Sequence, residues 1–260
     1  MLFLNKILFH VGIGGVKVDF QLRHGEWIAG SQVDGLLIFQ GGKFEQRLES
    51  CDISLYAEYT RYYTNAQGEH RSSSEKALIN SYTIPCQLQL QPSEYKELPA
   101  SLLLPLHTPA KFFREKVWFE TRLNNDQKIK SKDKDIITVL PDPLLKRVLN
   151  SMDRLGFTLF KSFMVNNADD QLSPDTFVQQ IVYSVSSDYQ VSLDEIIMIP
   201  VWMEHELRVT LQINTKKGLA KTLTGKDIIS ETIILEPDEW STKNDEQLTK
   251  LIQETIERNI

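Results

Sequence analysis

Apolar and polar residues alternate along most of the chain, in short runs separated by turn residues. Over Val16–Arg23 every second residue is apolar, which is typical of a β-strand with one buried face. The same period of two recurs over Cys51–Tyr59 and Val117–Leu123, and it returns after residue 136. Between two such runs, the Asn-Ala-Gln-Gly sequence at 65–68 predicts the tip of a hairpin. We therefore expect an all-β fold.

The predicted strands fall into two groups on either side of a polar stretch, Asn124–Asp135. Lysines and aspartates are mixed in this stretch, so we interpret it as a solvated linker. Short strands at regular intervals are typical of sandwiches and barrels, and the alternation of strands and helices that a parallel α/β sheet requires is not found. We predict two antiparallel β-sandwich domains in tandem, residues 1–130 and 131–236, followed by a terminal helix within 237–260.

Two segments before this terminal region are also predicted to be helical. Leu144–Leu155 carries apolar residues at helical intervals. Met1–Val11 is apolar but much shorter than the roughly 20 residues that a membrane-spanning helix needs, so we expect a short helix packed on the body. The glycines at 12, 14 and 15 precede a strand rather than a helix, which argues against a phosphate-binding loop and indicates a hinge.

The terminal segment has the clearest helix signal in the chain. Asn244 and Gln247 have the spacing of a capping box. The apolar residues that follow lie on one helix face; they are Leu248, Leu251, Ile252 and Ile256. Two interpretations stay open: this face docks on the chain's own sandwich, or it binds a partner protein or a second copy of the chain. Trp118, predicted on the solvent side of its strand, raises the same choice between a covering sheet and a partner.

Composition and charge narrow the function classes. The net charge is −6 and no segment is strongly basic, so nucleic-acid binding is not indicated. Cys51 and Cys86 stand alone in apolar surroundings, which favours reduced core cysteines in a cytoplasmic protein over a disulfide or a zinc site. The five histidines are scattered, and the polar loop Asn167–Asp175 lacks the glycine and the closing glutamate of an EF-hand. We expect no catalytic residue, no cofactor and no metal site.

The segment Val11–Leu22, with the sequence VGIGGVKVDFQL, resembles the opening of the bacterial stage-zero sporulation protein M family. In that family a short apolar helix leads through Val-Gly-Ile-Gly into a strand. Further short matches follow in the family's order, at residues 30–42, 104–109, 117–123, 132–141, 155–157, 177–179 and 193–195. The resemblance covers residues 1–220 and does not extend to the terminal helix.

This resemblance implies an arrestin-like fold of two β-sandwiches, in agreement with the strands predicted from the alternation. It also implies a non-enzymatic cytoplasmic regulator of sporulation, a scaffold that acts through contacts with other proteins. Two other hypotheses stay open. One is a peripheral membrane or envelope sensor that uses residues 1–11. The other is a hydrolase whose catalytic residues come together only in the fold.

Overall fold

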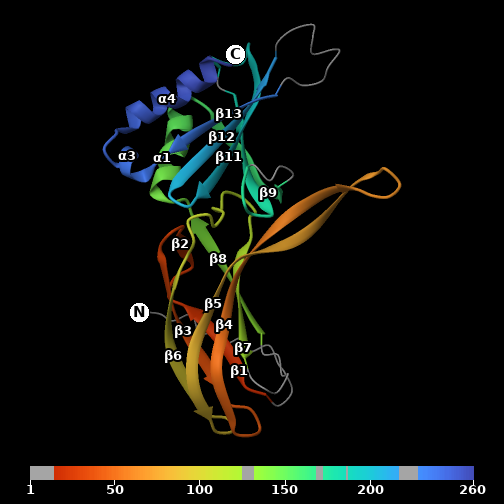
Figure 1. The fold of residues 1–260 in the computed structure, drawn as a ribbon, viewed down its shortest axis with the longest axis vertical. Helices are drawn as coiled ribbons and strands as arrows, with labels where there is room; N and C mark the ends of the chain where they lie inside the picture. Colours follow the sequence, from red (N-terminus) through yellow and green to blue (C-terminus); the bar gives the residue numbers. More distant parts are fainter. Residues whose placement is uncertain (1–14, 125–131, 168–171, 186, 217–227) are drawn as a thin grey trace. The chain divides into compact units, whose positions relative to one another are not determined.

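The structure is a computed structural model that describes residues 15–124, 132–167, 172–185, 187–216 and 228–260. Strands dominate these residues, and the predicted all-β fold class is confirmed. The chain divides into two compact units (Figure 1). Unit 1 comprises described residues within 1–58, 76–110 and 116–140, and unit 2 comprises those within 59–75, 111–115 and 141–260.

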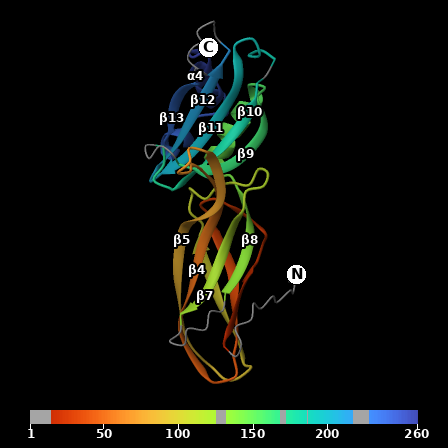
Figure 2. The ribbon, with the colours of Figure 1, turned by 90° about the vertical axis from the view of Figure 1, so that its right-hand side faces the viewer.

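Unit 1 is a sandwich of two sheets. The first sheet has the antiparallel order β1-β3-β6, with bounds Lys17–Leu22, Gln32–Gln40 and Tyr95–Leu103. The second has the order β5-β4-β7-β8-β2, with bounds His70–Leu90, Gln46–Thr64, Val117–Asn124, Lys132–Leu140 and Glu26–Ile28. Figure 2 shows β4, β7 and β8 side by side, and the register of both pairs is antiparallel. The short strand β2 pairs in parallel with β8.

The core of unit 1 lies between these two sheets. The apolar residues of the predicted strands point inward, as their period of two requires. Phe20 of β1 and Phe119 of β7 are both fully buried, and they pack edge to face with ring centroids 5.9 Å apart. Because the two rings come from different sheets, this contact joins the layers of the sandwich.

Unit 2 is built on an antiparallel sheet with the order β13-β12-β11-β10-β9. In that order the bounds are Ile228–Leu235, Glu206–Thr215, Leu193–Met203, Phe177–Ser184 and Thr158–Asn166. The tip of the β4–β5 hairpin also belongs to this unit. Thr60 pairs in parallel with Val165 of β9, and Tyr59 stacks on Phe177 with ring centroids 5.9 Å apart. The hairpin at 65–68 forms as predicted, since β4 ends at Thr64 and β5 begins at His70.

Helices cover one face of the unit 2 sheet, as Figure 1 shows. They are α1 (Pro143–Arg154), α3 (Pro237–Ser241) and α4 (Asp245–Glu257). Their apolar side chains share one buried cluster with the inward residues of the sheet, among them Met152, Ile181, Leu207, Leu211 and Ile252. The helices predicted at 144–155 and after Asn244 are therefore confirmed, and they supply the layer that closes this core.

The polar stretch Asn124–Asp135 is not a linker between the units. β7 ends at Asn124 and β8 begins at Lys132, and these two strands are paired inside unit 1. Asp133 is only 6% exposed, and burial together with the neighbouring Asp133 carboxylate raises the pKa of Asp135 to about 9. The prediction of a solvated linker is wrong for 132–135. The overlooked signal is that Asp133 and Asp135 continue the period of two that places Ile137 and Val139 inside.

The units also divide the chain differently from the predicted domains. The change from unit 1 to unit 2 comes after Leu140, because β8 pairs with β7 and β2. Residues 59–75 and 111–115, predicted within the first domain, belong with unit 2. The terminal residues 237–260 are part of unit 2 and not a separate segment, since α3 and α4 contribute to its core.

Two expectations concern residues at the start of the chain. The predicted helix over Met1–Val11 lies outside the described residues, as do the glycines at 12 and 14. No helix among the described residues is long and apolar enough to cross a membrane.

Cys51 and Cys86 are both buried in unit 1, and both are free thiols.

Candidate functional site

Unit 2 has an open groove where its helices meet. The groove has a volume of about 730 Å³ and lies between α1, the end of α3 and the beginning of α4. Its lining is polar and mostly charged, and consists of Arg147, Arg154, Ser241, Lys243, Asn244, Asp245 and Glu246. This is the candidate functional site of the chain.

The start of α1 fixes one wall of the groove. Asp142 caps the helix, because its Oδ1 accepts hydrogen bonds from the backbone N–H groups of Leu144 at 2.9 Å and Leu145 at 3.1 Å. Pro143 occupies the first turn, where its missing N–H costs nothing. The other carboxylate oxygen of Asp142 accepts from the indole Nε1 of Trp202 on β11 at 2.9 Å. Asp142 therefore ties the helix start directly to the sheet.

The start of α4 forms the opposite wall. The Asn244 side chain accepts from the Gln247 N–H at 2.9 Å, and the Gln247 side chain accepts from the Asn244 N–H at 2.9 Å. These two bonds confirm the predicted capping box. Asp245 and Glu246 lie in the first helical turn, where the helix dipole favours negative charge. The local sequence thus sets both the position where α4 begins and the acidic side of the groove.

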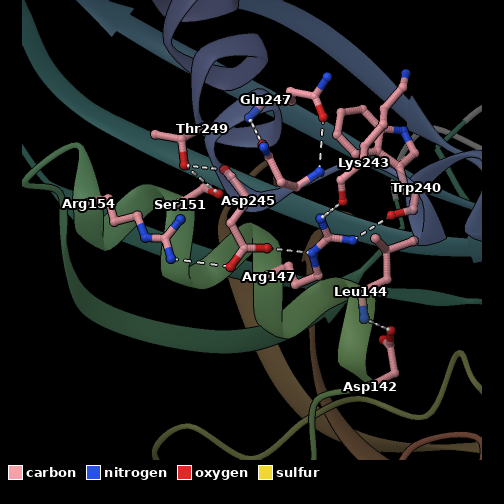
Figure 3. A network of polar contacts seen from close by, with 11 residues as sticks. Asp142, Leu144, Arg147, Ser151, Arg154, Trp240, Lys243, Asp245, Gln247 and Thr249 are labelled. Atoms are coloured by element: carbon pink, nitrogen blue, oxygen red, sulfur yellow. Dashed lines mark hydrogen bonds and ion pairs between the residues drawn. The ribbon is translucent and has the colours of Figure 1, made fainter.

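Arg147 joins the two walls, and Figure 3 shows its contacts. From α1, its Nε donates to Asp245 Oδ1 at 2.7 Å. Its Nη1 donates to the carbonyl of Trp240 and its Nη2 to the carbonyl of Lys243, both at 2.7 Å. The two carbonyls belong to the end of α3 and to the connection that follows it. One guanidinium therefore holds the end of α3, Lys243 in the connection before α4, and Asp245, the first residue of α4.

Asp245 lies between two arginines. Besides Arg147, the Nη2 of Arg154 donates to Asp245 Oδ2 at 3.2 Å. The hydrogen bond from Arg147, followed by the charges of both guanidinium groups, lowers the pKa of Asp245 below its ordinary value of 3.8. The carboxylate is therefore ionised at neutral pH and forms ion pairs with both guanidinium groups.

The remaining groups of the lining are suited to recognition by charge. The side chain of Arg154 is 48% exposed, and Lys243 contacts Glu239 while its ammonium group lies over the Trp240 ring, 4.5 Å from the centroid. The hydroxyl of Ser241 donates to the carbonyl of Asp238 at 2.7 Å, and the lining includes neither a histidine nor a cysteine to activate it. The groove can offer cationic donors to an acidic ligand, but it presents no pair of nucleophile and base.

The structure places the predicted contact face of the terminal helix inside the chain. Leu248, Ile252 and Ile256 are at most 1% exposed, and Leu251 packs against the same cluster while partly buried. In this structure the helix therefore docks on its own sheet, the first of the two interpretations left open. Binding of a partner to these four side chains stays a prediction, and it requires α4 to leave the sheet.

Trp118 lies on the outward side of β7, as its position in the alternation predicts, but its own chain covers it. The side chain is 4% exposed. Lys134 lies over the ring at 3.8 Å from the centroid, and Tyr56 stacks beside it with centroids 5.9 Å apart. Its indole Nε1 donates to Glu120 Oε1 at 3.2 Å. A partner would have to displace Lys134 before it reached the Trp118 ring.

The groove and the predicted site share no residue, although α4 contributes to both. The capping box was visible in the sequence, but Arg147 was not singled out. The residues next to an arginine on a helix do not indicate whether its side chain bridges several elements or is solvated. Its partners lie 93 to 98 residues further along the chain.

Comparison with known proteins decides the family. The sequence profile of the SpoOM protein family matches residues 4–218. The chain belongs to the SpoOM protein family. This membership confirms the resemblance stated from the sequence and places the chain among the sporulation-control proteins. The family is named for this control and not for a catalysed reaction.

A relative's sequence and a solved structure, both named Spo0M and both from Bacillus subtilis, agree with this assignment. The sporulation-control protein spo0M of Bacillus subtilis (strain 168) is 30% identical over 226 residues, which are 84% of this chain and 83% of that protein. The crystal structure of Spo0M from Bacillus subtilis aligns with a TM-score of 0.77 and 24% identity, and covers 95% of this chain and 99% of that one. The SpoOM fold is therefore shared. The family profile ends before α3 and α4, so one wall of the groove lies outside it.

Proposed function

We propose that this SpoOM family member is a non-catalytic cytoplasmic regulator of sporulation that acts as a scaffold for other proteins. The groove of unit 2 is its binding site, and it receives an acidic segment of a partner protein. Family membership supports the role in sporulation control, and the groove supports the mode of action.

The observation that supports the proposal is that the groove has rigidly held walls and exposed charged side chains. Arg147 makes three hydrogen bonds of 2.7 Å that hold α3 and α4 against α1, so the groove walls are set before a partner arrives. Arg154 and Lys243 keep donors on the open side, and the lining has three basic side chains against two acidic ones. A preformed, slightly basic groove favours a negatively charged ligand, with binding weakened by salt.

Charge reversal at the rim tests this function. We expect the double substitution R154E/K243E to reduce the recovery of a protein partner from a lysate of sporulating host cells at least about tenfold, because two attractive contacts become repulsive. The measurement is affinity capture with the full chain, quantified by mass spectrometry. Circular dichroism melts establish that the substituted chain is folded.

The matched control is K116E/K161E, which makes the same change in net charge at exposed positions outside the groove lining. It is expected to recover the partner like the parent chain. Equal recovery by the parent, the groove variant and the control would contradict the proposal, as would a parent chain that captures no protein specifically. The alternative of a membrane sensor stays a prediction, since residues 1–11 lie outside the described residues.

A further inference from the structure

Three carboxylates come together in unit 1, one of them more than a hundred residues along the chain from the other two. Asp19 lies on β1, at an edge of the first sheet, and Asp133 and Asp135 lie on β8 of the second sheet. One oxygen from each carboxylate lies within 4.8 Å of the other two. Asp19 is 5% exposed and Asp133 is 6% exposed, so the cluster is inside the protein and not on a solvated surface.

These carboxylates have few hydrogen-bond donors. The backbone N–H of Phe20 donates to Asp133 Oδ2 at 3.1 Å, and the Gln21 side chain donates to Asp19 Oδ2 at 3.0 Å. Asp135 Oδ2 is a buried atom without a hydrogen-bond partner. Among the described residues, no lysine or arginine forms an ion pair with any of the three. Buried carboxylates in this number either hold protons or require a positive charge close to them.

A fourth oxygen provides an independent sign of a ligand. Thr121 on β7 is fully buried and stands directly opposite Asp133 in the antiparallel register, so both side chains lie on the inner face of the sheet. Its Oγ1 has no hydrogen-bond partner, although an acceptor carboxylate is its cross-strand neighbour. A buried hydroxyl without a partner is costly, and a metal ion that takes its lone pair as a ligand removes that cost.

We propose that Asp19, Thr121, Asp133 and Asp135 form a binding site for Ca²⁺. All four donors are oxygens, which are the ligands of hard cations, and the nitrogen and sulfur donors that zinc prefers are missing from this set. Ca²⁺ lies roughly 2.3–2.6 Å from its ligands, so two ligand oxygens are at most about 5 Å apart. One oxygen from each of the three carboxylates meets this limit. Mg²⁺ would require its ligand oxygens to lie within about 4.2 Å of one another.

The ion would connect the two sheets of unit 1. Asp19 comes from β1 of the first sheet, and the other three ligands come from β7 and β8 of the second. A metal ion that binds only the folded state stabilises it by mass action. The sequence does not indicate this site, because the mixed lysines and aspartates around Asp133 and Asp135 predict a solvated segment.

Binding of Ca²⁺ to the full chain tests the proposal. After treatment with a chelator, isothermal titration calorimetry is expected to show one Ca²⁺ per chain, and saturating Ca²⁺ is expected to raise the melting temperature by roughly 5 °C. D135N is expected to weaken Ca²⁺ binding at least about tenfold, and T121V, which removes only the hydroxyl ligand, by a smaller factor. The control E97Q, an exposed residue of β6, keeps parental affinity.

The melting temperature of D135N in the absence of metal shows whether Asp135 acts as a metal ligand or only supports the fold. In chelator, D135N is expected to melt no lower than the parent, because burial and the neighbouring carboxylates already disfavour a charged group at this position and Asn is neutral. If D135N fails to fold, the affinity of T121V decides. A parent chain that binds no Ca²⁺ would show that the carboxylates share a proton instead. Variants that bind Ca²⁺ like the parent would show that the ion binds elsewhere. Tighter binding of Mg²⁺ than of Ca²⁺ would overturn the choice of ion.

Discussion

A chain that ends at Glu236 is expected to lose the folded state of unit 2. The truncation removes Trp240, Leu248, Ile252 and Ile256, each at most 4% exposed in the core beneath the helices. Burial of a large apolar side chain contributes about 1.5–3 kcal/mol, so the four together contribute roughly 6–12 kcal/mol. This sum is comparable with the whole stability of a domain, which is about 5–15 kcal/mol. Circular dichroism at 222 nm and amide hydrogen exchange would report the loss.

This truncation also decides between the two interpretations of the terminal helix. The control is K250A, since the Lys250 side chain is 76% exposed on the outer face of α4 and its loss leaves the core intact. If the truncated chain kept a cooperative unfolding transition in unit 2, α4 would not be part of the core. Its apolar face would then be free for a partner.

The substitution R147M is expected to destabilise unit 2 by about 3 kcal/mol. It removes three charge-assisted hydrogen bonds from a side chain that is 23% exposed, and it leaves Asp245 with the single longer contact to Arg154. Urea unfolding followed at 222 nm measures the effect, because the described helices all belong to unit 2.

The comparison with R154M gives this prediction its control. Arg154 is 48% exposed and makes one contact of 3.2 Å with Asp245, so its loss is expected to cost less than about 1 kcal/mol. Equal losses for the two variants would show that Arg147 is an ordinary surface arginine and not the residue that joins α1, α3 and α4.

Local patterns are sufficient to predict β1, β7 and α4. The alternation over Val16–Arg23 and Val117–Leu123 fixes which residues of β1 and β7 face the core, and the Asn244–Gln247 spacing fixes the start of α4. These features depend on residues within a few positions of one another. The period of two and the capping residues are features of neighbouring positions in the sequence. They can therefore be recognised without knowledge of contacts between distant residues.

The candidate sites depend on contacts between distant residues, and the sequence could not supply them. Arg147 meets residues more than 90 positions away, and Asp19 approaches Asp133 across 114 positions. Two signals also conflict at Asp133 and Asp135. Their period of two predicts a buried position, whereas the alternation of lysine and aspartate predicts a solvated segment. The pairing of β8 with β7 and the burial of Asp133 show that these aspartates face inward.

The claim that the groove binds a protein is tested most directly by cross-linking at its rim. A photoreactive amino acid placed at Glu246, an exposed residue of the lining, is expected to give one covalent adduct with a protein partner in sporulating host cells. The same amino acid at Ile234, which is 51% exposed on β13 between two residues that face the helices, is expected to give none. No adduct at 246, or equal adducts at 246 and 234, would contradict the assignment of the groove as the binding site.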